Sequence, residues 1–159
     1  HNYTNITMGL DQYLQSDYYF SDTWEDTATQ AAQVTAICGI PDDLLRIRQV
    51  SVRVTLIHWR NQYWLEEYIL RTAQADADAG EAYIDTEILS TFKQDAERVL
   101  INPELLDEVF PNPSWFSCLP GNQPRCVEDD LAFLKVIYTR LAQIFDKLPN
   151  ADFFYKSSC

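Results

Sequence analysis

The longest segment of this chain without a glycine or proline runs over residues 42–79. These two residue types are the strongest local breaks in secondary structure, so a segment of this length must form one long element or two adjoining ones. It holds five of the chain's twelve basic residues, all of them arginines, together with two tryptophans and two tyrosines. We expect so bulky and apolar a segment to lie at the centre of the fold rather than at an edge.

The residue pattern at the start of this segment fits two conformations. Valines at positions 50, 52 and 54 alternate with Ser51, Arg53 and Thr55, which is typical of a half-buried strand. The same valines, together with Ile57 and Trp64, also recur at helical spacing, and no turn signal separates them from the clearly helical residues that follow. The uninterrupted sequence favours a long helix, with a strand at 50–57 as the alternative.

Three further runs, residues 10–38, 81–101 and 127–148, show helical spacing of apolar residues between glycine or proline breaks. Four long helical runs joined by short connections predict an all-α fold, an irregular domain resembling a four-helix bundle. At 159 residues the chain has the length of a single domain, predicted over 1–159. If the strand at 50–57 forms, an α+β fold replaces the bundle.

The chain has four cysteines and no closely spaced pair of the kind that binds zinc. Cys118 and Cys126 flank a turn containing proline and glycine, so we predict a disulfide between them. The remaining pair, Cys38–Cys159, then links the end of the first helical run to the last residue. Two disulfides favour an oxidising, extracellular location.

Two N-glycosylation acceptor sequences, at Asn2 and Asn5, also favour a secreted glycoprotein. The chain does not open with a signal peptide, as expected of a secreted protein from which that peptide has been removed. No apolar run is long enough to insert into a membrane. The net charge of −12 makes the protein acidic and disfavours nucleic acid as a partner.

The charges are unevenly distributed along the chain. Residues 1–45 hold seven acidic residues and no lysine or arginine, and four arginines follow within the next fifteen residues. We therefore expect the acidic N-terminal part to pack beside the arginine-bearing segment.

No catalytic motif, phosphate-binding loop or cofactor-binding motif is present, so we predict no cofactor, and a non-enzymatic role is favoured over an enzyme. An excess of aromatic residues near arginines is typical of protein interfaces. The chain is therefore predicted to bind another protein, such as a receptor, a ligand or a surface glycoprotein. The alternatives are a carrier of an apolar or amphipathic small ligand held between helices, and a secreted enzyme. The predicted binding residues are Arg53, His58, Trp59, Arg60, Tyr63, Trp64, Trp115 and Phe116.

A weak calcium-site pattern lies between two of the predicted helices. Asp76, Asp78 and Glu87 stand at the first, third and twelfth positions of an EF-hand spacing. Gly80 replaces the fifth-position ligand, however, and Glu81 replaces the glycine at the sixth. We therefore expect an acidic turn here and predict no metal site.

Overall fold

The computed structural model describes residues 9–75, 80–113 and 124–158. Within them the chain forms an α+β fold with a four-stranded antiparallel sheet. The strands are β1 (Asp11–Ser21), β2 (Gln49–Arg60), β3 (Glu81–Ile84) and β4 (Asp152–Ser158). The helices are α1 (Ala28–Ile37), α2 (Tyr63–Thr72), α3 (Thr86–Ile101), α4 (Leu106–Val109) and α5 (Val127–Lys147), with 3₁₀ turns η1 (Asp42–Leu44) and η2 (Pro103–Leu105).

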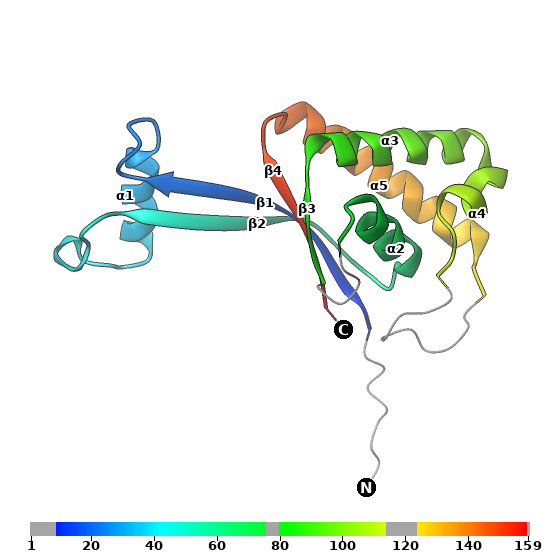
Figure 1. Cartoon of the computed structure of the whole chain (residues 1–159), viewed down its shortest axis with the longest axis horizontal. Coiled ribbons are helices and arrows are strands. Elements are labelled where there is room, and N and C mark those ends of the chain that lie inside the picture. The colour runs from blue at the N-terminus through cyan, green and yellow to red at the C-terminus, as the bar shows by residue number, and fades with distance from the viewer. Residues whose placement is uncertain (1–8, 76–79, 114–123, 159) are drawn as a thin grey trace, which may run out of the picture.

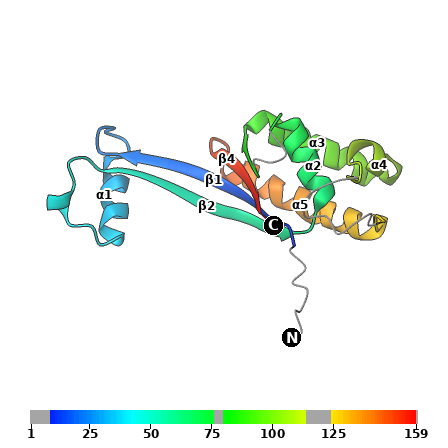
Figure 2. The ribbon, with the colours of Figure 1, turned by 60° about the horizontal axis from the view of Figure 1, so that its bottom comes forward.

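The sheet has the strand order β2-β1-β4-β3, and its strands differ greatly in length. β4 pairs with β1 only from Asp11 to Asp17, whereas β2 pairs with β1 as far as Ser21. Beyond Asp17 the two long strands therefore continue as a two-stranded ribbon. Residues 18–54, which comprise this ribbon, the connection at its end and the next two residues of β2, are here called the arm. The arm projects away from the other helices and carries α1 across its tip (Figures 1 and 2).

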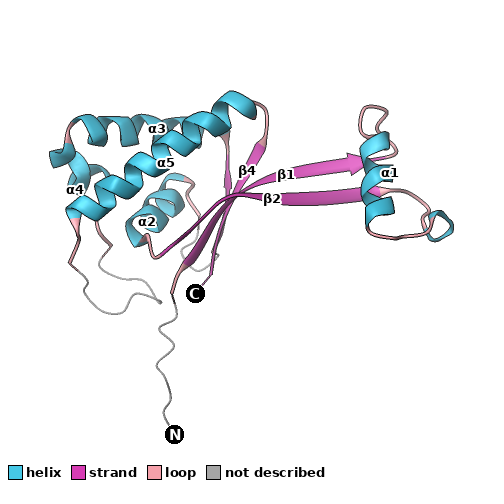
Figure 3. Ribbon diagram, turned by 180° about the vertical axis from the view of Figure 1, so that it is seen from behind, coloured by secondary structure: helices cyan, strands magenta, loops and turns pink. Residues whose placement is uncertain are grey.

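The remaining helices form the body together with the four-stranded part of the sheet. Helices α2, α3 and α5 pack on one side of the sheet (Figure 3). Burying a large apolar side chain stabilises a fold by about 1.5–3 kcal/mol, so this layer supplies most of the core stabilisation. The core of the body is built by side chains from both the sheet and the helical layer. Among the most deeply buried are Leu65, Val99, Phe110, Leu134, Leu141, Phe153 and Tyr155.

The predicted all-α, bundle-like fold is wrong, and the alternative α+β fold is the observed one. Residues 49–60 form strand β2 rather than a helix, and the predicted strand at 50–57 lies inside it. The branched side chains of Val50, Val52 and Val54 are well accommodated on a pleated strand, and β1 supplies the hydrogen-bonding partner that no local sequence signal reveals. The expected central position of residues 42–79 is wrong for β2, which is an edge strand, whereas α2 of the same segment buries Trp64, Leu65 and Tyr68 in the core.

The predicted helix at the start of the chain is also a strand. β1 buries Gln12, Leu14 and Ser16 on the face toward the helices. Two of these three side chains are polar, so the alternation of apolar and polar residues that identifies a half-buried strand is missing. Gln12 is accommodated because its side chain bonds the backbone on both sides of Gln62: its Nε2 donates to the carbonyl oxygen at 3.1 Å, and its Oε1 accepts from the amide at 2.8 Å.

Several helix predictions are confirmed. α5 covers Val127–Lys147, with acidic residues in its first turn and Lys147 in its last, as the helix dipole favours. α1 ends before Gly39, whose φ of +70° suits a glycine after a helix C-terminus. The predicted helix over 81–101 begins later, at Thr86, because the Asp85 carboxylate accepts a hydrogen bond from the Ile88 amide at 2.7 Å and caps it there.

The two predicted disulfides are wrong. Cys38 and Cys126 are both free and exposed, and their predicted partners, Cys159 and Cys118, lie outside the described residues. Cys38 follows α1 at the tip of the arm, whereas Ser158 pairs with Asp11 at the opposite end of β1. The length of β1 corresponds to roughly 30 Å, and a disulfide tolerates Cα separations of only about 4–7 Å.

None of the described helices is both long and apolar enough to cross a membrane.

Candidate binding surface

The structure separates the predicted binding residues into groups. Arg53, His58 and Arg60 lie on the face of the sheet opposite the body helices, here called the open face. Trp59 and Trp64 are buried in the core of the body. Tyr63 begins α2, where it is half-buried, and Trp115 and Phe116 lie outside the described residues.

A β-bulge brings Arg53 and His58 to the same face. Side chains alternate between faces along a strand, so residues five apart normally point in opposite directions. Leu56 is an extra residue in β2, because Thr55 pairs with Gln15 and Ile57 with Leu14. The extra residue reverses the alternation, and both side chains reach the open face.

The open face carries a compact group of charges around Arg53. Its guanidinium donates from Nε to Asp17 Oδ1 at 2.7 Å and from Nη2 to Asp17 Oδ2 at 3.0 Å. It also lies 4.0 Å from the centre of the Phe154 ring, as in a cation–π contact, and 4.0 Å from the Glu81 carboxylate. The hydrogen bond to Asp17 raises the pKa of the Arg53 guanidinium above its ordinary value. The guanidinium is therefore fixed in position by β1, β3 and β4.

A second charged group lies at the other end of β2. His58 Nε2 is 3.1 Å from Asp11 Oδ1, and its ring stacks on Tyr13 with centroids 4.8 Å apart. Arg60 Nε lies 3.0 Å from the same Asp11 oxygen. With Arg53 bound to Asp17, these pairs confirm that the acidic N-terminal part packs beside the arginine-bearing segment.

The described residues contain no group of three or more His, Cys, Asp and Glu side chains placed to hold a metal ion. Of the three residues with EF-hand spacing, Glu87 lies in the first turn of α3, and Asp76 and Asp78 lie outside the described residues. Strand β3 lies within the stretch of sequence that has the EF-hand spacing. This stretch is therefore not a loop that joins two helices directly.

The interior holds a buried carboxyl group, Glu66, that the sequence did not single out. It lies in α2 and is 4% exposed. The hydroxyl of Tyr155 donates to its Oε2, and that of Ser157 donates to its Oε1 at 2.7 Å. Gln12 Nε2 in turn donates to the Tyr155 hydroxyl at 3.0 Å. The only sequence sign was an acidic pair, Glu66-Glu67, within an otherwise bulky helix.

Burial dominates the electrostatics of this network. It raises the pKa of Glu66, although the hydrogen bonds from Tyr155 and Ser157 act in the opposite direction. Burial, and then the neighbouring Glu66 carboxyl, also raise the pKa of Tyr155. The network ties α2 to β4 and β1, which gives it a structural role.

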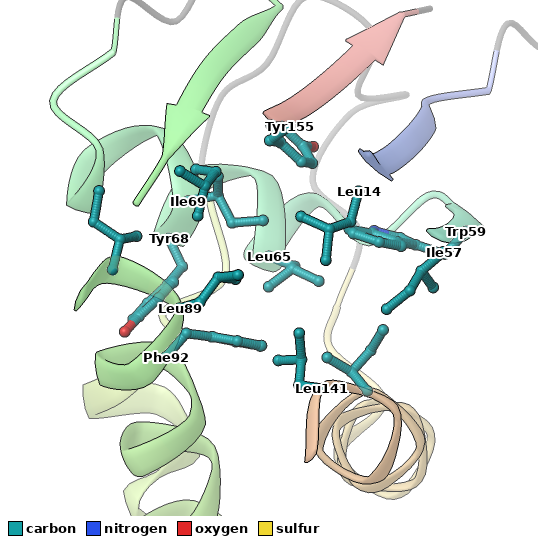
Figure 4. Close-up of a pocket in the computed structure, with 13 residues that line it drawn as sticks. Leu14, Ile57, Trp59, Leu65, Tyr68, Ile69, Leu89, Phe92, Leu141 and Tyr155 are labelled. Atoms are coloured by element: carbon teal, nitrogen blue, oxygen red, sulfur yellow. The ribbon is translucent and has the colours of Figure 1, made fainter. Parts of the chain in front are cut away.

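The body contains a small cavity between the sheet and the helices (Figure 4). Its volume is about 30 Å³, and its lining is apolar, including Leu65, Phe92 and Leu141. Pockets for small ligands usually measure about 300–1,000 Å³, so this space is far smaller than a usual ligand pocket. It therefore gives no support to the carrier alternative.

The arm, by contrast, exposes an unusual amount of apolar surface. Of the eleven large apolar side chains that are exposed in the described part of the chain, seven lie in the arm. Trp24 is 52% exposed, Leu44 72% and Ile37 84%. The full set in the arm is Tyr19, Trp24, Ile37, Ile40, Leu44, Ile47 and Val54. The sequence pattern did not predict that these side chains are exposed.

An open hollow of about 420 Å³ marks the place where the arm leaves the body. It is lined by residues of three strands: Asp17, Tyr18, Tyr19, Ser51, Val52, Arg53 and Asp152. The hollow therefore lies beside Arg53 of the charged open face and Tyr19 of the arm.

Comparison with known protein families, with curated proteins and with solved structures finds no significant match.

Proposed function

We propose that this chain is an extracellular, non-enzymatic binding domain that recognises another protein through its arm. The observation that carries the proposal is the concentration of exposed apolar side chains in residues 18–54. A concentration of exposed large apolar side chains in one part of a protein commonly marks an interaction site.

The tip of the arm has the residue types of an interface hot spot. Trp24 packs edge-on against Tyr19, with ring centroids 5.0 Å apart, so both aromatic side chains are held in place. Fixed aromatic anchors lose little conformational entropy on binding, and Trp and Tyr are enriched among hot-spot residues. Ile37 and Leu44 add exposed apolar area at the same end of the arm.

The arm lacks much of the packing that normally stabilises a two-stranded ribbon. A two-stranded ribbon is marginally stable by itself and normally needs a third strand or a packed helix. In the arm, α1 buries only Ala31 and Thr35, so its packing on the ribbon is slight. A partner that covers the arm would supply the missing burial.

The extracellular location is supported by the sequons at Asn2 and Asn5, which lie outside the described residues. The free thiols of Cys38 and Cys126 remove the support that paired cysteines would have given.

The test is partner capture from the extracellular fluid and cell surfaces of the native source, with arm and body variants compared. Trp24→Ser and Leu44→Ser should each weaken binding of the captured protein, by roughly 30-fold for a hot-spot residue. Ile101→Ser and Val136→Ser are the matched controls, since these side chains are 76% and 64% exposed on body helices. Equal losses for arm and body variants would contradict the proposal, as would no loss for the arm variants.

A further inference from the structure

Arg48 joins the two segments of the chain that form the tip of the arm. Residues 22–27 lead from β1 into α1, and residues 38–48 lead from α1 into β2. The Arg48 guanidinium lies 2.6 Å from a carboxylate oxygen of Asp42 and 3.9 Å from one of Asp22. The amide of Asp22 also donates to the Arg48 carbonyl oxygen at 3.0 Å. The two segments are therefore tied together, although a helix separates them in the sequence.

The exposed apolar side chains of the tip lie close to these bridged residues. Trp24 is two residues from Asp22, and Leu44 is two residues from Asp42. Both side chains are more than half exposed, and Trp24 is held by its contact with Tyr19. Both segments therefore present apolar groups at the same end of the arm.

The charges of the arm are only partly neutralised within this chain. The arm holds five acidic and three basic residues. Arg48 and Arg53 are already paired with carboxylates of this chain, which leaves Arg46 as the one basic side chain of the arm without an ion pair among the described residues. Three of its carboxylates have no ion pair in the same part of the chain: Glu25, Asp26 and Asp43.

These three carboxylates lie beside the exposed apolar side chains. Glu25 directly follows Trp24, and Asp43 directly precedes Leu44. All three carboxylate side chains belong to exposed residues. Protein interfaces typically have an apolar centre and a polar rim. A partner that covers Trp24 and Leu44 must therefore place its own rim beside unpaired negative charges.

Charge then decides which kind of partner fits. Like charges brought together across an interface weaken association, and opposite charges favour it. The three unpaired carboxylates outnumber the single unpaired Arg46, and the whole chain carries a net charge of −12. An acidic partner, including a second copy of this chain, would be repelled, whereas a basic one would be attracted.

We propose that the tip of the arm binds a basic surface of the partner protein, in which Lys or Arg side chains surround an apolar patch that packs against Trp24 and Leu44. The apolar contacts would hold the complex together, and the rim charges would speed its formation and select the partner. This inference rests on the proposed function, since it specifies the chemistry of the partner that the arm recognises.

The probe is a fluorescein-labelled helical peptide of about 14 residues, with leucines along one face and lysines on the other. Its binding to the whole chain is measured by fluorescence anisotropy at low and at physiological ionic strength. The matched control peptide carries Glu in place of each Lys. We expect saturable binding of the Lys peptide, weakened by added salt, and roughly tenfold weaker binding of the Glu peptide.

A triple variant tests the rim charges. Glu25→Gln, Asp26→Asn and Asp43→Asn together remove the three unpaired carboxylates and nearly preserve the size of each side chain. Three exposed charge pairs are lost, so the variant should bind the Lys peptide about tenfold more weakly, with a smaller dependence on salt. Circular dichroism and thermal melting establish that it is folded.

A second triple variant is the matched control. Glu97→Gln, Glu104→Gln and Glu108→Gln remove the same total charge from exposed positions of the body. Since these positions are not in the arm, the Lys peptide should bind this variant within about twofold of wild type. The comparison separates a local effect at the tip from the effect of net charge.

Trp24→Ser tests the apolar part of the surface. It should weaken the Lys peptide at least roughly tenfold, as expected for a hot-spot residue. Val136→Ser is the control, because this side chain is also exposed but lies on α5 in the body, and it should leave binding unchanged.

Three results of the peptide experiment would overturn the inference. They are equal binding of the Lys and Glu peptides, equal losses in the two triple variants, and full binding of the Lys peptide by Trp24→Ser. Two results would identify a different occupant and would also overturn it. Self-association that Leu44→Ser abolishes would identify a second copy, and co-sedimentation with phosphatidylcholine vesicles that Trp24→Ser abolishes would identify a membrane.

The outcomes distinguish this inference from the proposed function. If the Lys peptide does not bind at the tip but Trp24→Ser still loses the captured partner, the inference fails and the proposed function stands. If the Lys peptide binds at the tip and Trp24→Ser retains the captured partner, the proposed role of the arm fails instead.

Discussion

The buried carboxyl of Glu66 makes the stability of this protein depend on pH in an unusual direction. An unfolded glutamate titrates near the ordinary pKa of 4.5, and burial raises the pKa of Glu66 in the folded chain above that value. Between these two pKa values the folded protein binds more protons at this position than the unfolded one. The contribution of Glu66 is therefore fully present below pH 4.5 and is lost as pH rises through the folded pKa.

The perturbation that isolates this effect is Glu66→Gln. The amide keeps nearly the same shape and carries no charge, and the hydroxyls of Tyr155 and Ser157 can serve as acceptors for its N–H groups. We expect the difference in unfolding free energy, variant minus wild type, to increase with pH. Its slope in the titration window is at most about 1.4 kcal/mol per pH unit, the value for one proton.

The assay is urea unfolding followed by circular dichroism, at a series of pH values from about 4 to 8. The matched control is Glu67→Gln, since the neighbouring carboxyl on α2 is partly exposed and pairs with Arg71 at 3.7 Å. This control measures the effect of removing a neighbouring carboxylate from the same helix. Parallel stability curves for wild type and Glu66→Gln would refute the conclusion that burial dominates at Glu66, and a falling difference would reverse its sign.

Two further substitutions test the packing of the body. Gly80→Ala should destabilise the protein by more than about 1 kcal/mol, because Gly80 has φ +62° and an added Cβ would lie 2.9 Å from the Ser157 carbonyl oxygen. Thermal melting measures the loss, and a melting temperature at or above that of wild type would contradict it. Phe110→Ala should cost about 3–5 kcal/mol in chemical unfolding, because the ring is 0% exposed and lies 5.3 Å from Trp64 between centroids. Val136→Ala, at a site 64% exposed, should change stability by less than about 0.5 kcal/mol, and a comparable loss at both sites would contradict the assigned core.

The sequence determined the helices whose signals are local. α5 is marked by its apolar spacing, its acidic first turn and its terminal lysine, and α1 by the glycine that follows it. These signals act within a few residues, so they can be recognised without knowledge of the rest of the fold. The packing of the acidic N-terminal part beside the arginines could also be predicted, because the positions of the opposite charges are known from the sequence.

The strands were decided by tertiary structure. β1 and β2 pair residues that lie roughly 30 to 50 positions apart, so each supplies the hydrogen bonds that make the other a strand. β1 could not be recognised as a strand because two of its buried residues, Gln12 and Ser16, are polar. Polar residues are tolerated on the inner face only where the surrounding fold accommodates them, and the sequence does not show that surrounding.

The candidate surface was decided in the same way. The extra residue Leu56 brings Arg53 and His58 to one face, and strand pairing alone reveals it. The exposure of Trp24 and Leu44 follows from the projection of the arm beyond the body helices. Residue types showed that aromatic and arginine side chains were available for binding. Only the fold determined that Trp59 and Trp64 are core residues while the tip of the arm and the edge of β2 are exposed.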